Sequence, residues 1–151
     1  GRPSVLLKMA SPRRYIQPSH GVNIAPDVYG GAFRRDPHLA EKHAAKVRSS
    51  GKLGYYWQLF AGLGWTSVHW LHKIRQPTLI LAGDDDPIIP LVNMKLLAWR
   101  IPNSELHVID DGHLFLVTRA QSVAPLIMGF LAEERQPAVI RHTAALKAPR
   151  A

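Results

Sequence analysis

The stretch PTLILAGDDDP, residues 77–87, contains the pattern that determines the fold class. From Thr78 to Ala82 the chain is apolar or β-branched without interruption, with a proline before this run and a glycine after it. A short apolar run between turn residues is typical of a strand buried on both faces, as in a parallel sheet. We therefore expect a buried parallel strand here.

Helices and strands alternate after this run. Residues 90–100 carry apolar residues on one helical face and predict a helix. Residues 105–109 alternate in polarity and predict a second strand. Residues 119–134 predict another helix, with Pro125 near its first turns. This order, with short connections, indicates α/β construction around a parallel strand pair.

The first half of the chain has a different character. Residues 1–35 are rich in Pro, Gly, Ser and Arg, and four prolines there predict that helices are short. Residues 36–50 predict a helix with Asp36 as its N-cap and Pro37 in its first turn. The aromatic segment 55–70 follows, and two short helices separated near its glycines are expected.

Charge is distributed unevenly along the sequence. Residues 1–75 contain 12 Lys and Arg against 3 Asp and Glu, whereas residues 76–134 contain 3 against 8. The basic residues stand singly or in pairs, which favours a solvated basic surface over nucleic-acid binding, because a nucleic acid requires a continuous basic stripe. Attraction to an anionic granule or membrane surface is the other interpretation.

Composition excludes several classes of protein. The absence of cysteine excludes a disulfide framework, a thiolate metal site and a cysteine nucleophile. No apolar run approaches the roughly 18 residues of a membrane-spanning helix. No leader pattern follows Gly1. We expect a soluble cytoplasmic chain whose beginning is missing.

Two polar loops follow the predicted strands at the edge where open α/β sheets place their ligand sites. Residues 84–86 are three adjacent aspartates, and residues 110–113 read Asp-Asp-Gly-His. Neighbouring parallel strands lie about 4.8 Å apart, so an acid and an imidazole on these loops can meet. The acid would fix the tautomer of His113 and leave its other nitrogen free as a general base. Alternatively, Asp86 has no catalytic role and is favoured at this position because the dipole of the helix predicted to begin at Pro90 attracts acidic residues.

No serine nucleophile is recognisable in the chain. Such a serine is usually presented on a sharp strand-to-helix turn with the pattern Gly-x-Ser-x-Gly. None of the eight serines has this pattern, and there is no Gly-rich oxyanion loop. The serines are Ser4, Ser11, Ser19, Ser49, Ser50, Ser67, Ser104 and Ser122.

Both loops resemble those of the α/β-hydrolase fold. Gly83-x-x-Asp86-x-x-x-Pro90 is similar to its acid loop, and Gly112-His113 is similar to its histidine loop. More narrowly, residues 1 to about 136 resemble the intracellular depolymerases of medium-chain-length poly(3-hydroxyalkanoates). The segments that carry this resemblance are ASPRRY (10–15), KLGYYWQLFAGLGWTS (52–67), LAGDDDP (81–87) and VIDDGHLFL (108–116), of which the aromatic block is the most specific.

The resemblance implies the C-terminal part of an α/β-hydrolase fold with a helical lid. Residues 1–70 would be the lid, residues 71–136 the last two strand–helix units of the core, and residues 137–151 a flexible basic tail. The implied activity is that of a Ser–Asp–His esterase that hydrolyses stored polyester at cytoplasmic granules. Asp86 would be the triad acid and His113 the general base.

The same resemblance places the nucleophile and the oxyanion loop upstream of Gly1. We therefore expect these residues to be a fragment that is inactive by itself. The mechanism requires no metal and no organic cofactor, and Asp84 and Asp85 do not fit the spacing of the acid and are expected to support its loop.

Aromatic residues of the lid are the candidate substrate-binding residues. A lid over a polyester requires apolar surface for the alkyl side groups, which favours contact of Trp57, Phe60 and Trp65 with the polymer. Alternatively, these rings form the core of the lid itself. The expected partners are the polyester and its granule surface. Another α/β hydrolase (a carboxylesterase, lactonase or perhydrolase) and a non-catalytic granule-binding module are the alternative functions.

Overall fold

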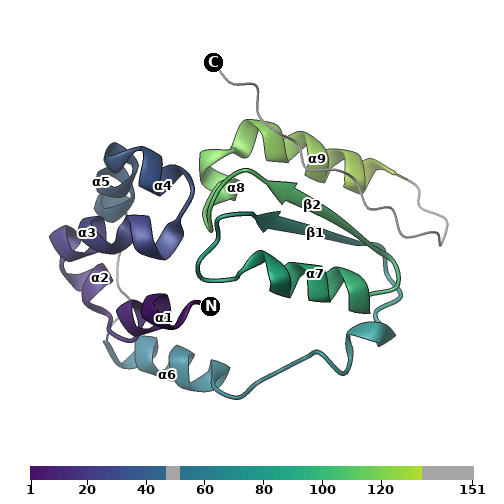
Figure 1. Ribbon diagram of the computed structural model, residues 1–151, viewed down its shortest axis with the longest axis horizontal. Helices are drawn as coiled ribbons and strands as arrows, with labels where there is room; N and C mark the ends of the chain where they lie inside the picture. Colours follow the sequence, from purple (N-terminus) through teal and green to yellow (C-terminus); the bar gives the residue numbers. More distant parts are fainter. Residues whose placement is uncertain (47–51, 134–151) are drawn as a thin grey trace.

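Two parallel strands form the centre of the fold. The computed structural model describes residues 1–46 and 52–133. In it β1 (Thr78–Gly83) pairs with β2 (Ser104–Ile109) in parallel, and the last residues of the two strands lie opposite each other. Both predicted strands are confirmed to within one residue. Because the strands end in register, the loops that follow them leave the same edge of the sheet (Figure 1).

Helices cover both faces of the strand pair. On one face Ile80 packs in a cluster with α7 (Leu91–Arg100). On the other face Leu81 packs in a cluster with α9 (Ala120–Ala132). Alternate residues of a strand point to opposite faces, so the burial of β1 on both faces accounts for its uninterrupted apolar sequence. The helices predicted at 90–100 and 119–134 are confirmed within the described residues.

The first half of the chain is helical and faces the carboxyl ends of the strands (Figure 1). Pro3, Pro18 and Pro37 each occupy the first position of a helix, where the missing N–H is not needed. The helices are α1 (Pro3–Met9), α2 (Arg13–Ile16), α3 (Pro18–Tyr29), α4 (Ala32–Arg35), α5 (Pro37–Lys46) and α6 (Lys52–Gly62).

Helix α3 corrects one expectation. It is 12 residues long and contains Pro26, so the prediction of only short helices before residue 36 is wrong for this segment. A proline in a helix removes one hydrogen bond and crowds the preceding turn. Ala25 and Val28, on either side of this proline in the sequence, are buried.

The predicted features of α5 and α6 are confirmed in part. The Asp36 carboxylate accepts the N–H of His38 at 2.9 Å, as an N-cap does, whereas the expected end of α5 near residue 50 lies outside the described residues. Helix α6 ends at Gly62 as expected. The second helix expected in the aromatic segment does not form: residues 63–70 are turns and irregular chain, and one 3₁₀ turn, η1 (Leu71–Lys73), follows them.

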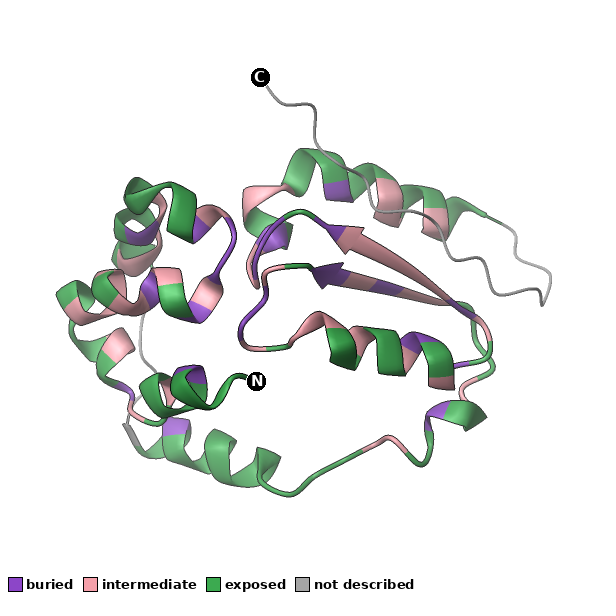
Figure 2. Cartoon of the chain, in the orientation of Figure 1, coloured by how far each residue is buried: buried purple, intermediate pink, exposed green. Residues whose placement is uncertain are grey.

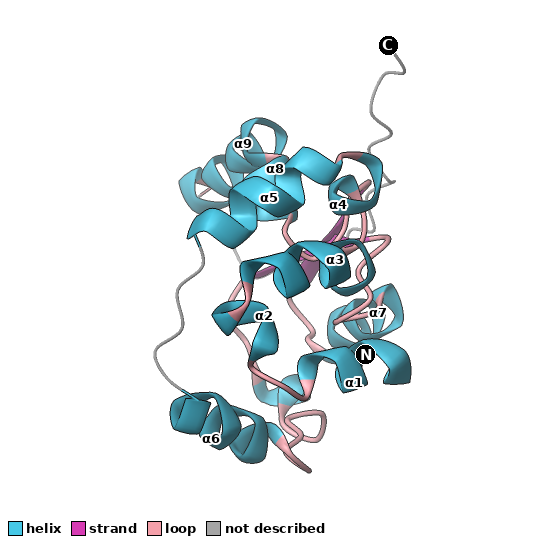
Figure 3. Cartoon of the chain, turned by 90° about the vertical axis from the view of Figure 1, so that its left-hand side faces the viewer, coloured by secondary structure: helices cyan, strands magenta, loops and turns pink. Residues whose placement is uncertain are grey.

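Helix α6 is exposed along nearly its whole length, whereas α3, α4 and α5 pack together. Ala25, Phe33 and Ala40 form a buried cluster between α3, α4 and α5. In α6 only Tyr55 is buried among the residues whose burial is described (Figure 2). Figure 3 shows α6 at the periphery of the molecule, away from the sheet. Along the described ranges, no helix is long and apolar enough to span a membrane.

The proposed division into a lid (1–70), a hydrolase core (71–136) and a tail stays a prediction. The tail, 137–151, lies outside the described residues.

Candidate active site

Asp86 and His113 meet at the edge of the sheet. His113 Nδ1 lies 2.8 Å from Asp86 Oδ2. The other carboxylate oxygen accepts the backbone N–H groups of Ile88 at 2.8 Å and Ile89 at 2.9 Å. Only 8% of Asp86 is exposed. The acid is therefore held on both sides in a single orientation.

This contact leaves one nitrogen of His113 available for chemistry. When Nδ1–H donates to Asp86, Nε2 is the unprotonated nitrogen and can accept a proton. No hydrogen bond to Nε2 occurs within the part of the chain that the structure describes, and 30% of the His113 side chain is exposed. A fixed imidazole with one accessible nitrogen has the geometry of a general base.

The acid and histidine loops continue the pairing of the strands that precede them. The N–H of Asp84 donates to the carbonyl of Ile109 at 3.0 Å, and the N–H of Asp85 donates to the carbonyl of Asp111 at 3.2 Å. The separation of Asp86 and His113 is consequently set by backbone hydrogen bonds of the sheet edge.

Helical residues from the first half of the chain hold the histidine loop. The N–H of His113 donates to the carbonyl of Tyr29 at 2.7 Å. A Cβ atom on Gly112 would lie 1.9 Å from the same carbonyl oxygen. Gly31 approaches this loop with φ of +49°, a conformation that favours glycine. The two segments are in direct backbone contact, which no larger residue at position 112 permits.

The three aspartates of the acid loop have different environments. Asp84 is exposed, whereas Asp85 accepts the N–H of Gly31 at 2.8 Å and both of its oxygens lie 2.6 Å from Arg34 Nη1. Asp85 thus ties the loop to α4, in agreement with a supporting role.

Asp111 is a site residue that the sequence reasoning missed. It is 2% exposed, and its carboxylate accepts the N–H groups of Ala32 and Gly112 and the hydroxyl of Thr118. The one feature of the sequence that could have indicated Asp111 is its position directly before Gly112-His113. Asp110 occupies an almost equivalent position, so the sequence did not distinguish the buried carboxylate from the exposed one.

The structure does not bring the aromatic candidates to Asp86 and His113. Trp57 is 65% exposed, Phe60 72% and Trp65 68%. They belong to α6 and the segment after it, which follow the periphery of the molecule (Figure 1). The interpretation of these rings as a core of the lid is therefore wrong.

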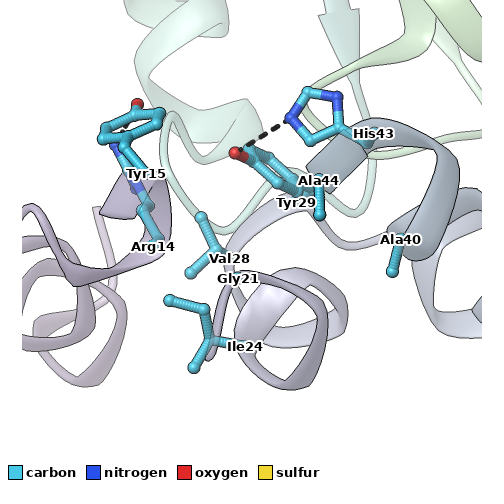
Figure 4. A pocket seen from close by; sticks show the side chains of 9 residues that line it. All are labelled: Arg14, Tyr15, Gly21, Ile24, Val28, Tyr29, Ala40, His43 and Ala44. Atoms are coloured by element: carbon cyan, nitrogen blue, oxygen red, sulfur yellow. Dashed lines mark hydrogen bonds between the residues drawn. The ribbon is translucent and has the colours of Figure 1, made fainter. Parts of the chain in front are cut away.

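A pocket lies between α2, α3 and α5 (Figure 4). Tyr29 and His43 meet in it, with 3.3 Å between the hydroxyl oxygen and Nε2. Burial raises the pKa of the Tyr29 hydroxyl, and burial together with the Arg14 charge lowers the pKa of His43. The Arg14 guanidinium lies 4.6 Å from the centre of the Tyr15 ring. Tyr29 therefore links this pocket, through its carbonyl, to the histidine loop.

Within the described ranges, no three His, Asp or Glu side chains gather in a group that could hold a metal ion.

Comparison with known proteins identifies related chains. Residues 3–120 match the family model for the alpha/beta hydrolase fold. A poly(3-hydroxyalkanoate) depolymerase of Ectopseudomonas oleovorans is 75% identical over 140 residues, which are 93% of this chain and 50% of that protein. A 2-hydroxy-6-oxononadienedioate/2-hydroxy-6-oxononatrienedioate hydrolase of a Pseudomonas species is 30% identical over 114 residues, 72% of this chain and 36% of that protein.

A solved structure gives the same result for the fold. The crystal structure of the enol-lactonase from Burkholderia xenovorans LB400 aligns with a TM-score of 0.71 at 19% identity, covering 88% of this chain and 52% of that one. The predicted fold class and the resemblance to the depolymerases are confirmed. The chain spans half the length of the depolymerase and about a third of the second relative.

Gly112→Ala tests the backbone contact at the histidine loop. The added Cβ collides with the Tyr29 carbonyl, so we expect the free energy of unfolding to fall by about 3 kcal/mol. Urea denaturation measures this. The matched control is Gly54→Ala, where a Cβ meets nothing within 4 Å and a gain of about 0.5–1 kcal/mol is expected in the helix. Equal effects of the two substitutions would contradict the contact.

His43→Gln tests the burial of His43. Because its pKa is lowered in the folded chain, the unfolded chain takes up the proton first. His43 therefore costs stability as the pH falls below about 6.5. We expect the fall in Tm between pH 7.5 and pH 5 to be smaller in His43→Gln. His38→Gln, at an exposed position of the same helix, should retain the wild-type fall. An unchanged pH dependence in His43→Gln would refute this.

Proposed function

The chain belongs to the alpha/beta hydrolase fold family, and on that basis we propose that it carries the acid and the base of a serine esterase that hydrolyses intracellular poly(3-hydroxyalkanoate). The contact of 2.8 Å between His113 Nδ1 and Asp86 Oδ2 carries this proposal. The identity of 75% to a poly(3-hydroxyalkanoate) depolymerase supports the choice of substrate.

In the proposed mechanism His113 acts as general base and then as general acid. Its Nε2 takes the hydroxyl proton while the serine oxygen attacks the ester carbonyl, and Asp86 stabilises the imidazolium that forms. The protonated His113 then gives its proton to the leaving alkoxide. An acyl-enzyme results, and water activated by the same histidine releases a 3-hydroxy acid or a short oligomer. No metal or organic cofactor takes part.

We place the nucleophile outside these 151 residues. The absence of a Gly-x-Ser-x-Gly pattern supports this, as does the half of the depolymerase that this chain leaves unmatched. In this proposal the 151 residues alone are inactive.

The exposed aromatic residues form the proposed polymer-binding surface, defined as Trp57, Phe60 and Trp65. These rings, on α6 and the segment after it, leave apolar area in contact with water that an insoluble polyester can cover. Such a surface would hold the enzyme at cytoplasmic polymer granules, with residues 1–70 serving as the lid and residues 71–136 as the hydrolase core.

A hydrolase of soluble esters is the second candidate. The 30% identity to a 2-hydroxy-6-oxononadienedioate/2-hydroxy-6-oxononatrienedioate hydrolase favours a substrate other than the polymer but does not indicate an ester. A non-catalytic granule-binding module is the third, and the exposed aromatic surface favours it.

A chimera tests the catalytic proposal. These 151 residues would replace the matched half of the Ectopseudomonas oleovorans depolymerase, and release of 3-hydroxy acids from emulsified medium-chain-length polymer would be measured. We expect activity in the chimera and none in the 151 residues alone. His113→Ala should lower kcat at least about 1,000-fold, because proton transfer from the serine is lost.

The matched pair for the acid is Asp86→Asn and Asp84→Asn. Asp86→Asn should be nearly as damaging as His113→Ala, whereas the exposed Asp84 should tolerate the change with less than about a twofold effect. The reverse ranking would assign the acid to Asp84. Hydrolysis of a soluble ester without hydrolysis of polymer would favour the second candidate.

Cosedimentation with polymer granules tests the binding surface. Removing all three rings, as Trp57→Ala, Phe60→Ala and Trp65→Ala together, should weaken binding at least about a hundredfold, because each aromatic ring that the polymer covers contributes about 1 kcal/mol or more. Trp99→Ala removes an equally exposed tryptophan from α7 and should leave binding unchanged. Equal losses in the two variants would indicate nonspecific adsorption.

A further inference from the structure

Asp111 is a buried carboxylate for which the mechanism above has no use. It is 2% exposed. Its Oδ1 accepts the N–H of Ala32 at 2.5 Å and the N–H of Gly112 at 2.8 Å, and its Oδ2 accepts the hydroxyl of Thr118. The three donors come from α4, from the next residue of the same turn, and from α8 (Phe115–Thr118).

Two arginines balance its charge. Arg35 Nη2 lies 3.6 Å from Oδ1, and Arg119 Nε lies 3.6 Å from Oδ2. A buried charge is strongly destabilising unless it is paired and hydrogen-bonded, and a well-packed apolar residue is often at least as stable in its place. Stability alone therefore gives no reason to bury an aspartate at this position.

The position of Asp111 suggests another reason. It precedes His113 by two residues, and its carbonyl accepts the N–H of Asp85, next to the proposed acid. Its carboxylate holds Ala32, and the N–H of His113 is bonded to the carbonyl of Tyr29, three residues before Ala32. Both ends of the turn that carries the histidine are thus fixed to one short stretch, residues 29–32.

We propose that Asp111 is a positioning residue for His113: its carboxylate fixes the turn 111–113 to residues 29–32 and so keeps Nδ1 of His113 within hydrogen-bonding distance of Asp86. The proposal rests on the proposed function, because it takes His113 as the base. Asp111 acts through the histidine and does not touch the substrate.

The chain offers a matched control for this residue. Asp110 is adjacent, carries the same charge and lies 3.7 Å from the same arginine, Arg35, but about half of its side chain is exposed. Asp110→Asn and Asp111→Asn change the net charge equally. Only Asp111→Asn removes charge from the carboxylate that binds Ala32 and Gly112.

The experiment is a measurement of the ring tautomer of His113 in the 151-residue chain. Two-bond ¹H–¹⁵N spectra at pH 8 distinguish Nδ1–H from Nε2–H imidazoles, and His113→Gln assigns the signals. We expect the Nδ1–H form in the wild-type chain and in Asp110→Asn, and a mixture of both forms in Asp111→Asn. A purely structural role would lower Tm in Asp111→Asn and leave the tautomer unchanged, and that result would overturn the proposal.

Thr118 provides a second variant if Asp111→Asn does not fold. Thr118→Val removes the hydroxyl that donates to Oδ2 at nearly constant volume, and Thr118→Ser restores it. We expect the tautomer mixture in the valine variant and recovery of the Nδ1–H form in the serine variant. The wild-type tautomer in both would refute the positioning role.

The chimera separates this proposal from the proposed function. Asp111→Asn should lower kcat at least about tenfold with little change in KM, whereas Asp110→Asn should change neither. An inactive wild-type chimera would contradict the proposed function, and the tautomer spectra, which require no catalysis, would still decide the role of Asp111. An unchanged kcat in an active Asp111→Asn chimera would count against the positioning role.

Discussion

The parallel pairing of β1 and β2 is the constraint on which the candidate site depends. Because Gly83 and Ile109 end their strands opposite each other, the acid and histidine loops begin at one edge and exchange backbone hydrogen bonds there. The contact between Asp86 and His113 follows from that register. A shift of one residue in either strand would turn its side chains to the opposite face and separate the pair.

Opposite charges join the two halves of the chain. Arg34 and Arg35 of α4 lie against Asp85, Asp110 and Asp111, which follow the two strands. The excess of basic residues before residue 76 and of acidic residues after it is thus in part an internal complementarity. The sequence favoured a solvated surface for the basic residues. Arg34 and Arg35 instead attach α4 to the loops at the sheet edge.

Local sequence patterns predicted the sheet and the approach of an acid of the 84–86 loop to His113, because strand burial and parallel spacing are properties of short segments. The choice of Asp86 among the three aspartates came from the resemblance to the α/β-hydrolases. The catalytic roles of Asp86 and His113 stay predictions. The position of Asp111 could not be predicted, since its partner Ala32 is 79 residues away and no local pattern indicates that contact. For the same reason the sequence did not show that Tyr55 is buried against Met9 and Tyr15 while Trp57 is exposed.

The long separation between residues 29–32 and 111–113 also has a consequence for folding kinetics. Helices and the β1–α7–β2 unit are local in sequence and can form early, whereas closing a loop of about 80 residues carries a larger entropic cost. The turn that carries His113 is completed only when that closure occurs. We therefore expect the turn 111–113 to be among the last segments to reach its native packing, after the β1–α7–β2 unit has formed.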